Sequence, residues 1–206
     1  MGEPAWDHRL TVEQYLSLER EAELRHEYHD GDMLAMAGGT KNHGILGNAI
    51  NGELYAICRS KSCTPFNGDV RIWIQAHNRF VYPEASVVCG PIETSAHDED
   101  SIINPVLIAE VLSKTSEAYD RGEKFRYYRS LPSLQEYLLI DQRRPIVSIF
   151  RRRDDQIWEM QEVIGLDQTF HLQSLDATIE MAELYRNTIG LLEPWESDRD
   201  EEEDEA

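Results

Sequence analysis

Residues 105–112 read Pro-Val-Leu-Ile-Ala-Glu-Val-Leu, an apolar run interrupted by one carboxylate, Glu110. Apolar side chains fall on both alternating faces of the run, which is typical of a strand buried inside a sheet. The next segment, about 116–130, is expected to be helical and to end at Leu131-Pro132, since the residue before a proline disfavours helical geometry. This succession of strand and helix predicts an α/β or α+β fold with a central mixed sheet flanked by helices. Further strands are expected at 136–140, 146–151 and 157–163.

The chain before residue 105 adds helices and a hairpin. Thr11 and Gln14 form a capping-box pattern that begins a helix reaching about Leu24. Asp30-Gly31 predicts the turn of a hairpin over residues 26–37. Gly38-Gly39-Thr40 breaks the chain and caps a second helix. The remaining expectations are that helix at 41–59, strands at 70–74 and 80–88, a polar loop at 93–101 and a short helix near 181–187.

One domain is expected, because no internal repeat or break in composition marks a second. We place it at 11–190, after an N-terminal extension over 1–10 and before an acidic tail over 191–206. Residues 193–206 hold nine acids and one arginine. Such a run cannot bury apolar surface and repels itself, so the tail is expected to be disordered and solvating, although competition for a basic groove is an alternative.

Composition narrows the class of protein. The 206 residues carry a formal net charge of -19 and 41% hydrophobic residues, enough for a core but unlike a basic nucleic-acid coat. No apolar run approaches a membrane span, and the first residues lack the pattern of a secretory signal. Three cysteines, Cys58, Cys63 and Cys89, form no CxxC pair and are expected to be reduced thiols. A cytoplasmic protein without membrane contact is therefore expected.

Buried carboxylates are the best candidates for chemistry. Glu110 sits in a strand that is apolar on both faces, where a bare carboxylate is costly, so it must be paired, protonated or bound to a cation. Glu84 follows a proline in a second apolar run. Two such carboxylates on adjacent strands would suit Mg²⁺, which takes few protein carboxylates and keeps its waters. A structural salt bridge with a core arginine is the alternative for Glu110.

Other charged residues are candidates on the same reasoning. Glu27, after the first helix, and Asp69, after a turn glycine, could join the carboxylates or could be structural. Lys124 lies four residues after Asp120 on the expected third helix. The two could form an ordinary surface ion pair, or Lys124 could point into the carboxylate cluster and stabilise charge on a phosphate.

Basic residues concentrate between Arg121 and Arg153, a stretch that contains nine Lys or Arg residues and three acidic residues. Clustered cations, rather than overall charge, determine affinity for a phosphate backbone. An ordinary solvated face is the alternative. The candidates for contact with nucleic acid are Arg121, Arg126, Arg129, Arg151, Arg152 and Arg153.

An ordered set of motifs resembles a known family. The set comprises Arg25-His-Glu27-Tyr-His-Asp-Gly31, His43 at the start of the second helix, Tyr82-Pro83-Glu84-Ala-Ser-Val-Val, Ile108-Ala-Glu110-Val-Leu-Ser113, Tyr119-Asp120-Arg-Gly-Glu-Lys124, Tyr128 and Glu136-Tyr137-Leu-Leu-Ile-Asp141. Over about residues 10–186 the chain resembles the Uma-two family of restriction endonuclease-like proteins, within the PD-(D/E)XK nuclease superfamily.

The resemblance implies a restriction-endonuclease-like core that uses Mg²⁺ or Mn²⁺ to hydrolyse phosphodiesters. Glu84 takes the place of the motif aspartate and Glu110 that of the motif glutamate. The superfamily lysine would stand at 112, which is leucine here, and Lys124 takes its role. Glu27 matches an additional acid.

One departure leaves alternatives open. The family usually has Pro-Asp where this chain has Pro83-Glu84, and a longer side chain changes the geometry available to Mg²⁺. The expected function is a Mg²⁺-dependent DNA endonuclease, with a homodimer plausible for cutting two strands. The alternatives are a non-catalytic nucleic-acid or protein binding module and a hydrolase of small phosphoesters.

Overall fold

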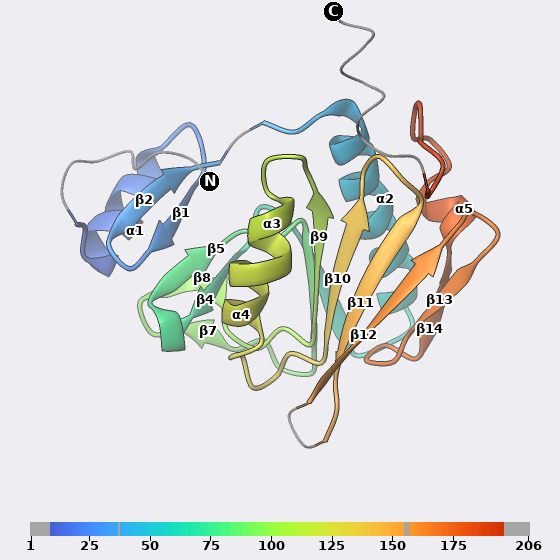
Figure 1. Ribbon diagram of the computed structural model, residues 1–206. Coiled ribbons are helices and arrows are strands. Elements are labelled where there is room, and N and C mark those ends of the chain that lie inside the picture. The colour runs from blue at the N-terminus through green and yellow to red at the C-terminus, as the bar shows by residue number, and fades with distance from the viewer. Residues whose placement is uncertain (1–8, 37, 155–156, 196–206) are drawn as a thin grey trace, which may run out of the picture.

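The computed structural model describes residues 9–36, 38–154 and 157–195. Two six-stranded sheets dominate it (Figure 1). The central sheet has the order β12-β11-β10-β9-β6-β3, and the outer sheet has the order β2-β1-β5-β4-β8-β7. The strands of the central sheet are Trp158–Ile164 (β12), Ile146–Arg152 (β11), Glu136–Asp141 (β10), Leu107–Leu112 (β9), Ala85–Cys89 (β6) and Cys63–Asn67 (β3).

The outer sheet carries the N-terminal hairpin. Its strands are Asp32–Ala35 (β2), His26–His29 (β1), Arg79–Val81 (β5), Arg71–Ile74 (β4), Asp98–Ile102 (β8) and Thr94–Ser95 (β7). The single-turn helix η1 (Gln75–His77) joins β4 to β5, and α1 (Val12–Glu21) packs on this sheet through Tyr15 and Leu16. The predicted capping box of Thr11 and Gln14 and the predicted hairpin at Asp30-Gly31 are both confirmed.

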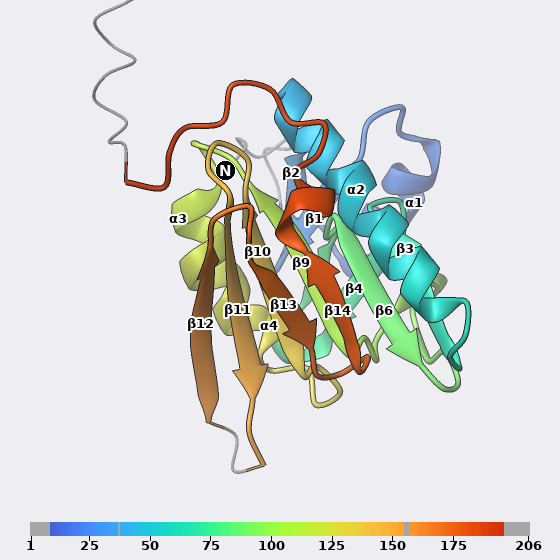
Figure 2. The same cartoon turned by 90° about the vertical axis from the view of Figure 1, so that its right-hand side faces the viewer.

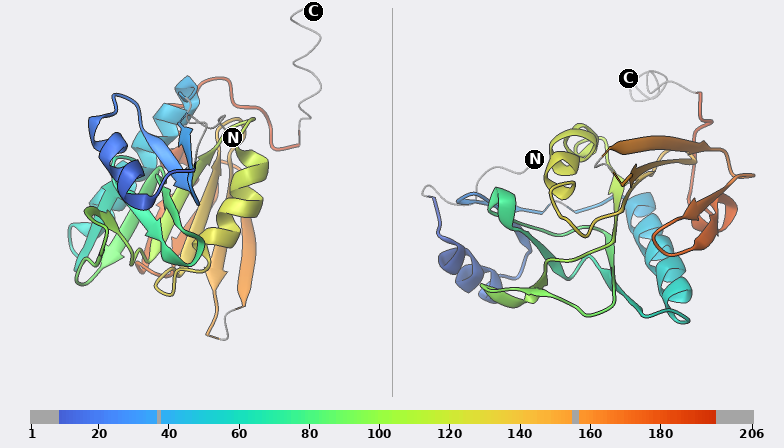
Figure 3. Two further views of the ribbon diagram at one scale, coloured as in Figure 1. Left: turned by 90° about the vertical axis from the view of Figure 1, so that its left-hand side faces the viewer. Right: turned by 90° about the horizontal axis from the view of Figure 1, so that it is seen from below.

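The central strand is confirmed where residues 105–112 predicted it. Every residue of β9 is buried, and β9 pairs in parallel with β10 and antiparallel with β6. Helix α2 (Lys41–Cys58) covers one face of the central sheet. The other face is covered by a continuous helical segment, α3 (Glu117–Tyr119), the π-helical turn η2 (Asp120–Lys124) and α4 (Phe125–Tyr128). Figures 2 and 3 show these helices on opposite sides of the sheet.

The C-terminal part of the chain packs on the same face of the central sheet as α2. The hairpin β13 (Thr169–Leu172) and β14 (Ala177–Glu180), followed by α5 (Met181–Leu184), buries Phe170, Leu172 and Leu184 in the core beneath α2. The sequence predicted the helix and missed the hairpin. Leu191 packs against the same core and the Leu192 amide donates to the Arg143 carbonyl at 2.8 Å, so the packed chain extends two residues past the expected boundary at 190. Most of the expected tail, 196–206, and residues 1–8 of the expected extension lie outside the described residues.

Two predicted segments need correction. The run 80–88 is divided at Pro83 into β5 and β6, which belong to different sheets. The expected polar loop at 93–101 contains β7 and most of β8. Its charge disguised the strand, because Asp98 is buried where the Arg71 guanidinium and the Ser101 hydroxyl donate to it.

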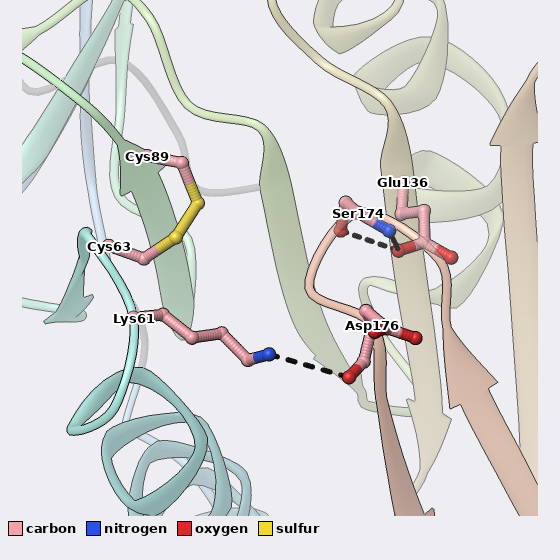
Figure 4. The surroundings of a disulfide bond; sticks show 6 residues. All are labelled: Lys61, Cys63, Cys89, Glu136, Ser174 and Asp176. Carbon is pink, nitrogen blue, oxygen red and sulfur yellow. Dashed lines mark hydrogen bonds between the residues drawn. A yellow bond between two sulfur atoms is a disulfide. The ribbon is translucent and has the colours of Figure 1, made fainter.

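The expectation of three reduced cysteines is also wrong. Strand β3, which contains Pro65 and was not predicted, lies at the edge of the central sheet and pairs antiparallel with β6. The register sets Cys63 opposite Cys89, with their Cα atoms 4.0 Å apart, and the two form a disulfide (Figure 4). Cys58 is a buried free thiol.

None of the described helices is both long and apolar enough to cross a membrane.

Candidate active site

A cavity of about 780 Å³ opens beyond the carboxyl ends of β9 and β10. Glu27, Glu84, Glu110, Asp120 and Lys124 all line it. Glu27 belongs to β1 and Glu110 to β9, and Glu84 immediately precedes β6. Asp120 and Lys124 are the first and last residues of η2. The fold thus brings together five sequence-predicted site residues that are distant in the chain.

Lys124 is the centre of this group. Its ammonium lies 2.8 Å from Glu110 Oε1, 3.5 Å from Glu27 Oε1 and 3.8 Å from Asp120 Oδ1. The Lys124 side chain is only 8% exposed. The acids around it raise its pKa well above the usual value against the opposing effect of burial, so Lys124 carries a charge at neutral pH. Because the side chains of both Lys124 and Asp120 are buried, the alternative of an ion pair on the solvated surface is excluded.

The π-helical turn aims Lys124 into the cavity. Asp120 and Lys124 bracket η2 and both are buried. The Tyr137 hydroxyl donates to the Asp120 carbonyl at 3.2 Å. Single π turns within α-helices occur frequently at functional sites.

Glu110 is held in a low-dielectric environment. Its side chain is 7% exposed, and Oε1 accepts hydrogen bonds from Lys124 Nζ and from the Tyr128 hydroxyl at 2.9 Å. Burial raises the pKa of Glu110 to about 8, assisted by the charges of Asp120 and Glu84 and opposed by Lys124. A cation in the cavity would favour the ionised carboxylate.

Glu27 has the opposite electrostatic balance. Burial acts to raise its pKa, but the Lys124 charge and the hydrogen bond with His29 outweigh it and lower the pKa to about 2. His29 Nε2 lies 2.9 Å from Glu27 Oε2, and the Tyr82 amide donates to Oε1 at 3.3 Å. Glu27 is therefore ionised and fixed in place.

Glu84 is the most accessible of the three glutamates, with a side chain 28% exposed. Its Oε1 lies 3.3 Å from His43 Nε2 on the first turn of α2. A Cβ atom added to Gly47, one turn further along α2, would lie 2.8 Å from Glu84 Oε2. The glycine thus leaves room for the carboxylate of a glutamate between α2 and β6.

The donor set fits a cation that needs few protein ligands. Glu84 and Glu110 line one cavity, and within the described chain neither Oε2 atom has a hydrogen-bond partner. No set of three or more His, Cys, Asp and Glu side chains in the described residues is arranged to hold a metal ion. Mg²⁺ commonly binds through one or two carboxylates and completes its shell with water and substrate oxygens.

Asp69 lies apart from these residues. It is exposed and forms an ion pair with Arg25. The structure does not bring it to the cavity, so a structural role explains it.

The basic stretch divides into three groups. Arg121 donates to Glu117 and Ser148, and Arg126 and Arg129 are exposed on or just after α4. Arg151 pairs with Glu136, which lies at the far end of β10 from the cavity. Arg152 donates to the carbonyls of residues 129, 131 and 132, and Arg153 pairs with Glu159. Arg151 is thus three residues along β10 from the level of Glu110, about 10 Å, with Arg152 and Arg153 further away, and their contact with nucleic acid stays a prediction.

Sequence reasoning missed several residues of the cavity wall. His29 shares a strand face with Glu27, because residues two apart on a strand point the same way, and this spacing could have identified it. Lys41, Lys114, Tyr119 and Arg143 also line the cavity. Lys41 begins α2 and Tyr119 ends α3, whereas Lys114 and Arg143 lie in loops, and no sequence pattern shows that these elements meet at one cavity.

Comparison with known proteins agrees with this architecture. The sequence model of the Uma2 family, described as "Putative restriction endonuclease", matches residues 12–184. The chain belongs to the Uma2 family. The uncharacterized Synechocystis proteins slr1290 and sll1609 are each 33% identical to it, over 86% and 76% of this chain and 92% and 88% of their own lengths.

A solved structure extends the likeness to three dimensions. The crystal structure of a putative nuclease belonging to DUF820 from Anabaena variabilis has a TM-score of 0.71 at 16% identity, covering 87% of this chain and 99% of that one. The Uma2 protein thus has the restriction-endonuclease-like fold that its motifs led us to expect, and family and fold together support a nuclease.

Proposed function

We propose that this Uma2 protein is a Mg²⁺-dependent endonuclease that hydrolyses DNA phosphodiester bonds. One observation carries the proposal: Glu84, Glu110 and the charged Lys124 line one cavity, with Lys124 Nζ 2.8 Å from Glu110 Oε1. Carboxylates that can bind a divalent cation, next to a fixed ammonium, are the groups that phosphodiester hydrolysis requires.

Each residue has a distinct task. Glu84 and Glu110 would hold Mg²⁺ or Mn²⁺, which when bound lowers the pKa of water and neutralises phosphate charge. Lys124 would orient the attacking water and stabilise charge on a non-bridging phosphate oxygen. Glu27, fixed by His29 and the Tyr82 amide, positions the Lys124 ammonium. His43 positions Glu84.

Cleavage of supercoiled plasmid and of single-stranded DNA, with Mg²⁺ or Mn²⁺ and with EDTA, tests the proposal. Glu110→Gln should abolish cleavage, and Glu183→Gln, an exposed glutamate on α5, is the matched control. Cleavage undiminished in Glu110→Gln would refute the site. Hydrolysis of nucleotides without binding to DNA would favour a small-phosphoester hydrolase, and DNA binding without calorimetric Mg²⁺ binding would favour a binding module.

We further propose a homodimer through β12, which ends the central sheet. The Arg153 amide donates to the Ile157 carbonyl, and the Gly165 amide donates to the Pro145 carbonyl. The odd-numbered residues of β12 therefore direct their backbone N–H and C=O groups toward β11. The even-numbered residues therefore direct their backbone groups outward. Met160 and Ile164 are 55% and 49% exposed on this edge. A long edge strand with exposed apolar side chains is a template for another strand.

The strand is complementary to a second copy of itself. Antiparallel pairing about Gln161 would set Trp158 opposite Ile164 and Met160 opposite Glu162, with no like charges directly opposed. Within each chain, Glu159 already pairs with Arg153, and Glu162 accepts the Ser148 hydroxyl. Two copies would supply the two sites that cutting both strands of a duplex requires.

A further inference from the structure

A second cluster of basic side chains lies beside the cavity. His77 ends η1, Arg79 begins β5 and Arg126 lies on α4. The Tyr127 ring contacts the first two: its centroid is 4.0 Å from the Arg79 guanidinium carbon and 4.8 Å from the His77 ring. Arg79 Nη2 also donates to the Tyr127 hydroxyl at 3.1 Å. The cluster is thus held in a defined arrangement by a largely buried aromatic ring.

Burial and the charges of Arg126 and Arg79 lower the pKa of His77, so the two arginines carry the charge of this cluster, and they have no counter-charge. Within the described chain, neither Arg79 nor Arg126 forms an ion pair with a carboxylate, although the protein has 39 acidic residues. Arg79 Nη2 donates to Tyr127, whereas Arg79 Nη1 has no hydrogen-bond partner among the described residues and, unlike Nε, is not buried. Nη1 is therefore a donor that an oxyanion can reach. The arrangement is therefore complementary to an anion.

The cluster is continuous with the wall of the cavity. Arg79 is paired directly with His29 across β5 and β1, and His29 lines the cavity and contacts Glu27. Tyr119, which also lines the cavity, has its hydroxyl 3.5 Å from His29 Nε2. Burial raises the pKa of the Tyr119 hydroxyl, and the charges of Lys124 and Arg79 both oppose the rise. Arg79 is thus close enough to act on the cavity wall.

We propose that His77, Arg79 and Arg126 form a phosphate-binding subsite that holds the nucleic-acid backbone beside the cavity. The inference rests on the proposed nuclease function and adds the direction in which the substrate strand leaves the site. A guanidinium presents a planar set of donors that matches phosphate oxygens in pairs. Arg79 would be the fixed contact and Arg126 the exposed one. The strand would pass from the carboxylates over His29 and Tyr119 toward α4.

The test measures DNA binding apart from cleavage. A fluorescent single-stranded and a duplex oligonucleotide are titrated at several salt concentrations, by anisotropy, with EDTA present. Arg126→Ala should weaken binding about 10-fold, the size of one charge-assisted hydrogen bond to phosphate, and reduce the slope of log K against log salt by about 1. Arg79→Lys, which keeps the charge but loses the paired donors, should also weaken binding, and its thermal midpoint measures separately what the lost contacts with Tyr127 cost the fold.

Arg59→Ala is the matched control. Arg59 is an exposed arginine at the C-terminal end of α2, whereas the N-terminal end of that helix lines the cavity. Arg59→Ala changes the net charge as much as Arg126→Ala does and should leave DNA affinity and the salt slope unchanged. Equal weakening by Arg59→Ala, or no effect of Arg126→Ala, would overturn the subsite. So would competition by polyglutamate as effective as that by DNA, because the cluster would then bind acidic chains in general. These results do not depend on cleavage, so the subsite and the nuclease function fail separately.

Discussion

Lys124 Nζ lies 2.8 Å from Glu110 Oε1, although the two residues belong to a π-helical turn and to the central strand of the sheet. The contact joins a charged ammonium to a carboxylate whose pKa burial raises to about 8. Because Glu27 is ionised on the other side of Lys124, the ammonium is compensated even when Glu110 is protonated. Glu110 can therefore gain or lose its proton while Lys124 keeps its positive charge and its ionised partner Glu27.

Two substitutions of Lys124 distinguish the effect of its charge from the effect of the position of that charge. Lys124→Met should destabilise the fold by about 3–5 kcal/mol, because it leaves buried acids without their partner. Lys124→Arg keeps the charge but not its position. It should preserve most of the stability while lowering cleavage by about 100-fold, as misplacement of a catalytic group by about 1 Å does. Urea denaturation and plasmid cleavage measure the two effects, and an active Lys124→Met would contradict the role.

Gly47 gives a test of Glu84 that leaves the carboxylate in place. Gly47→Ala would put a Cβ atom 2.8 Å from Glu84 Oε2. The end of a flexible side chain can move away, so the fold should persist while cleavage falls by about 10-fold or more through displacement of the carboxylate. Gly52→Ala on the same helix meets no atom within 4 Å and should raise stability by about 0.5–1 kcal/mol without changing cleavage. Equal cleavage by the two variants would argue against a role for Glu84.

The sequence was sufficient for the parts of this site that depend on local pattern. The apolar run around Glu110 predicted a buried strand, and Thr11, Asp30-Gly31 and Thr40 marked helix and hairpin boundaries that the structure confirms. It was insufficient where tertiary pairing overrides composition. Strand β8 is hidden by charge that Arg71 neutralises, and β3 by Pro65 at a sheet edge.

The same limit applies to the candidate residues. Glu27, Glu84, Glu110 and Lys124 meet because four separate elements converge, which the family motifs implied and no spacing could derive. The basic stretch looked uniform in sequence. Only the structure distinguishes Arg151, already paired with Glu136, from Arg126, which has no carboxylate partner among the described residues.

The Cys63–Cys89 disulfide should stabilise the edge of the central sheet. The bond closes a loop between residues 26 apart in sequence, for which loop-closure entropy predicts about 2–4 kcal/mol. Cys63→Ser combined with Cys89→Ser should lower the urea midpoint to that of the protein treated with reductant, and reductant should then have no further effect. Thiol titration of the unfolded protein should find only Cys58 free. Three free thiols after purification without reductant would contradict the bond.

The β12 interface should respond to charge placed on its exposed edge. Met160→Glu should convert a dimer to a monomer in light scattering coupled to size exclusion, because residue 160 lies opposite Glu162 of the second copy and two carboxylates would then be directly opposed. Leu24→Glu, which changes a side chain 67% exposed after α1, is the control and should leave the mass unchanged. A wild-type monomer at micromolar concentration would exclude this interface.

The pH dependence of stability should identify Glu110 without any cleavage assay. Its pKa is raised from 4.5 to about 8 in the folded protein, so the folded state retains a proton that the unfolded state loses. The contribution of Glu110 is thus fully present below pH 4.5 and is lost as the pH rises to about 8, at up to about 1.4 kcal/mol per pH unit. Glu110→Gln mimics the protonated form, so it should flatten the fall in the urea midpoint between pH 5 and 8 measured with EDTA. Glu183→Gln should retain the wild-type slope, and a slope unchanged in Glu110→Gln would show that Glu110 is already ionised in the folded protein.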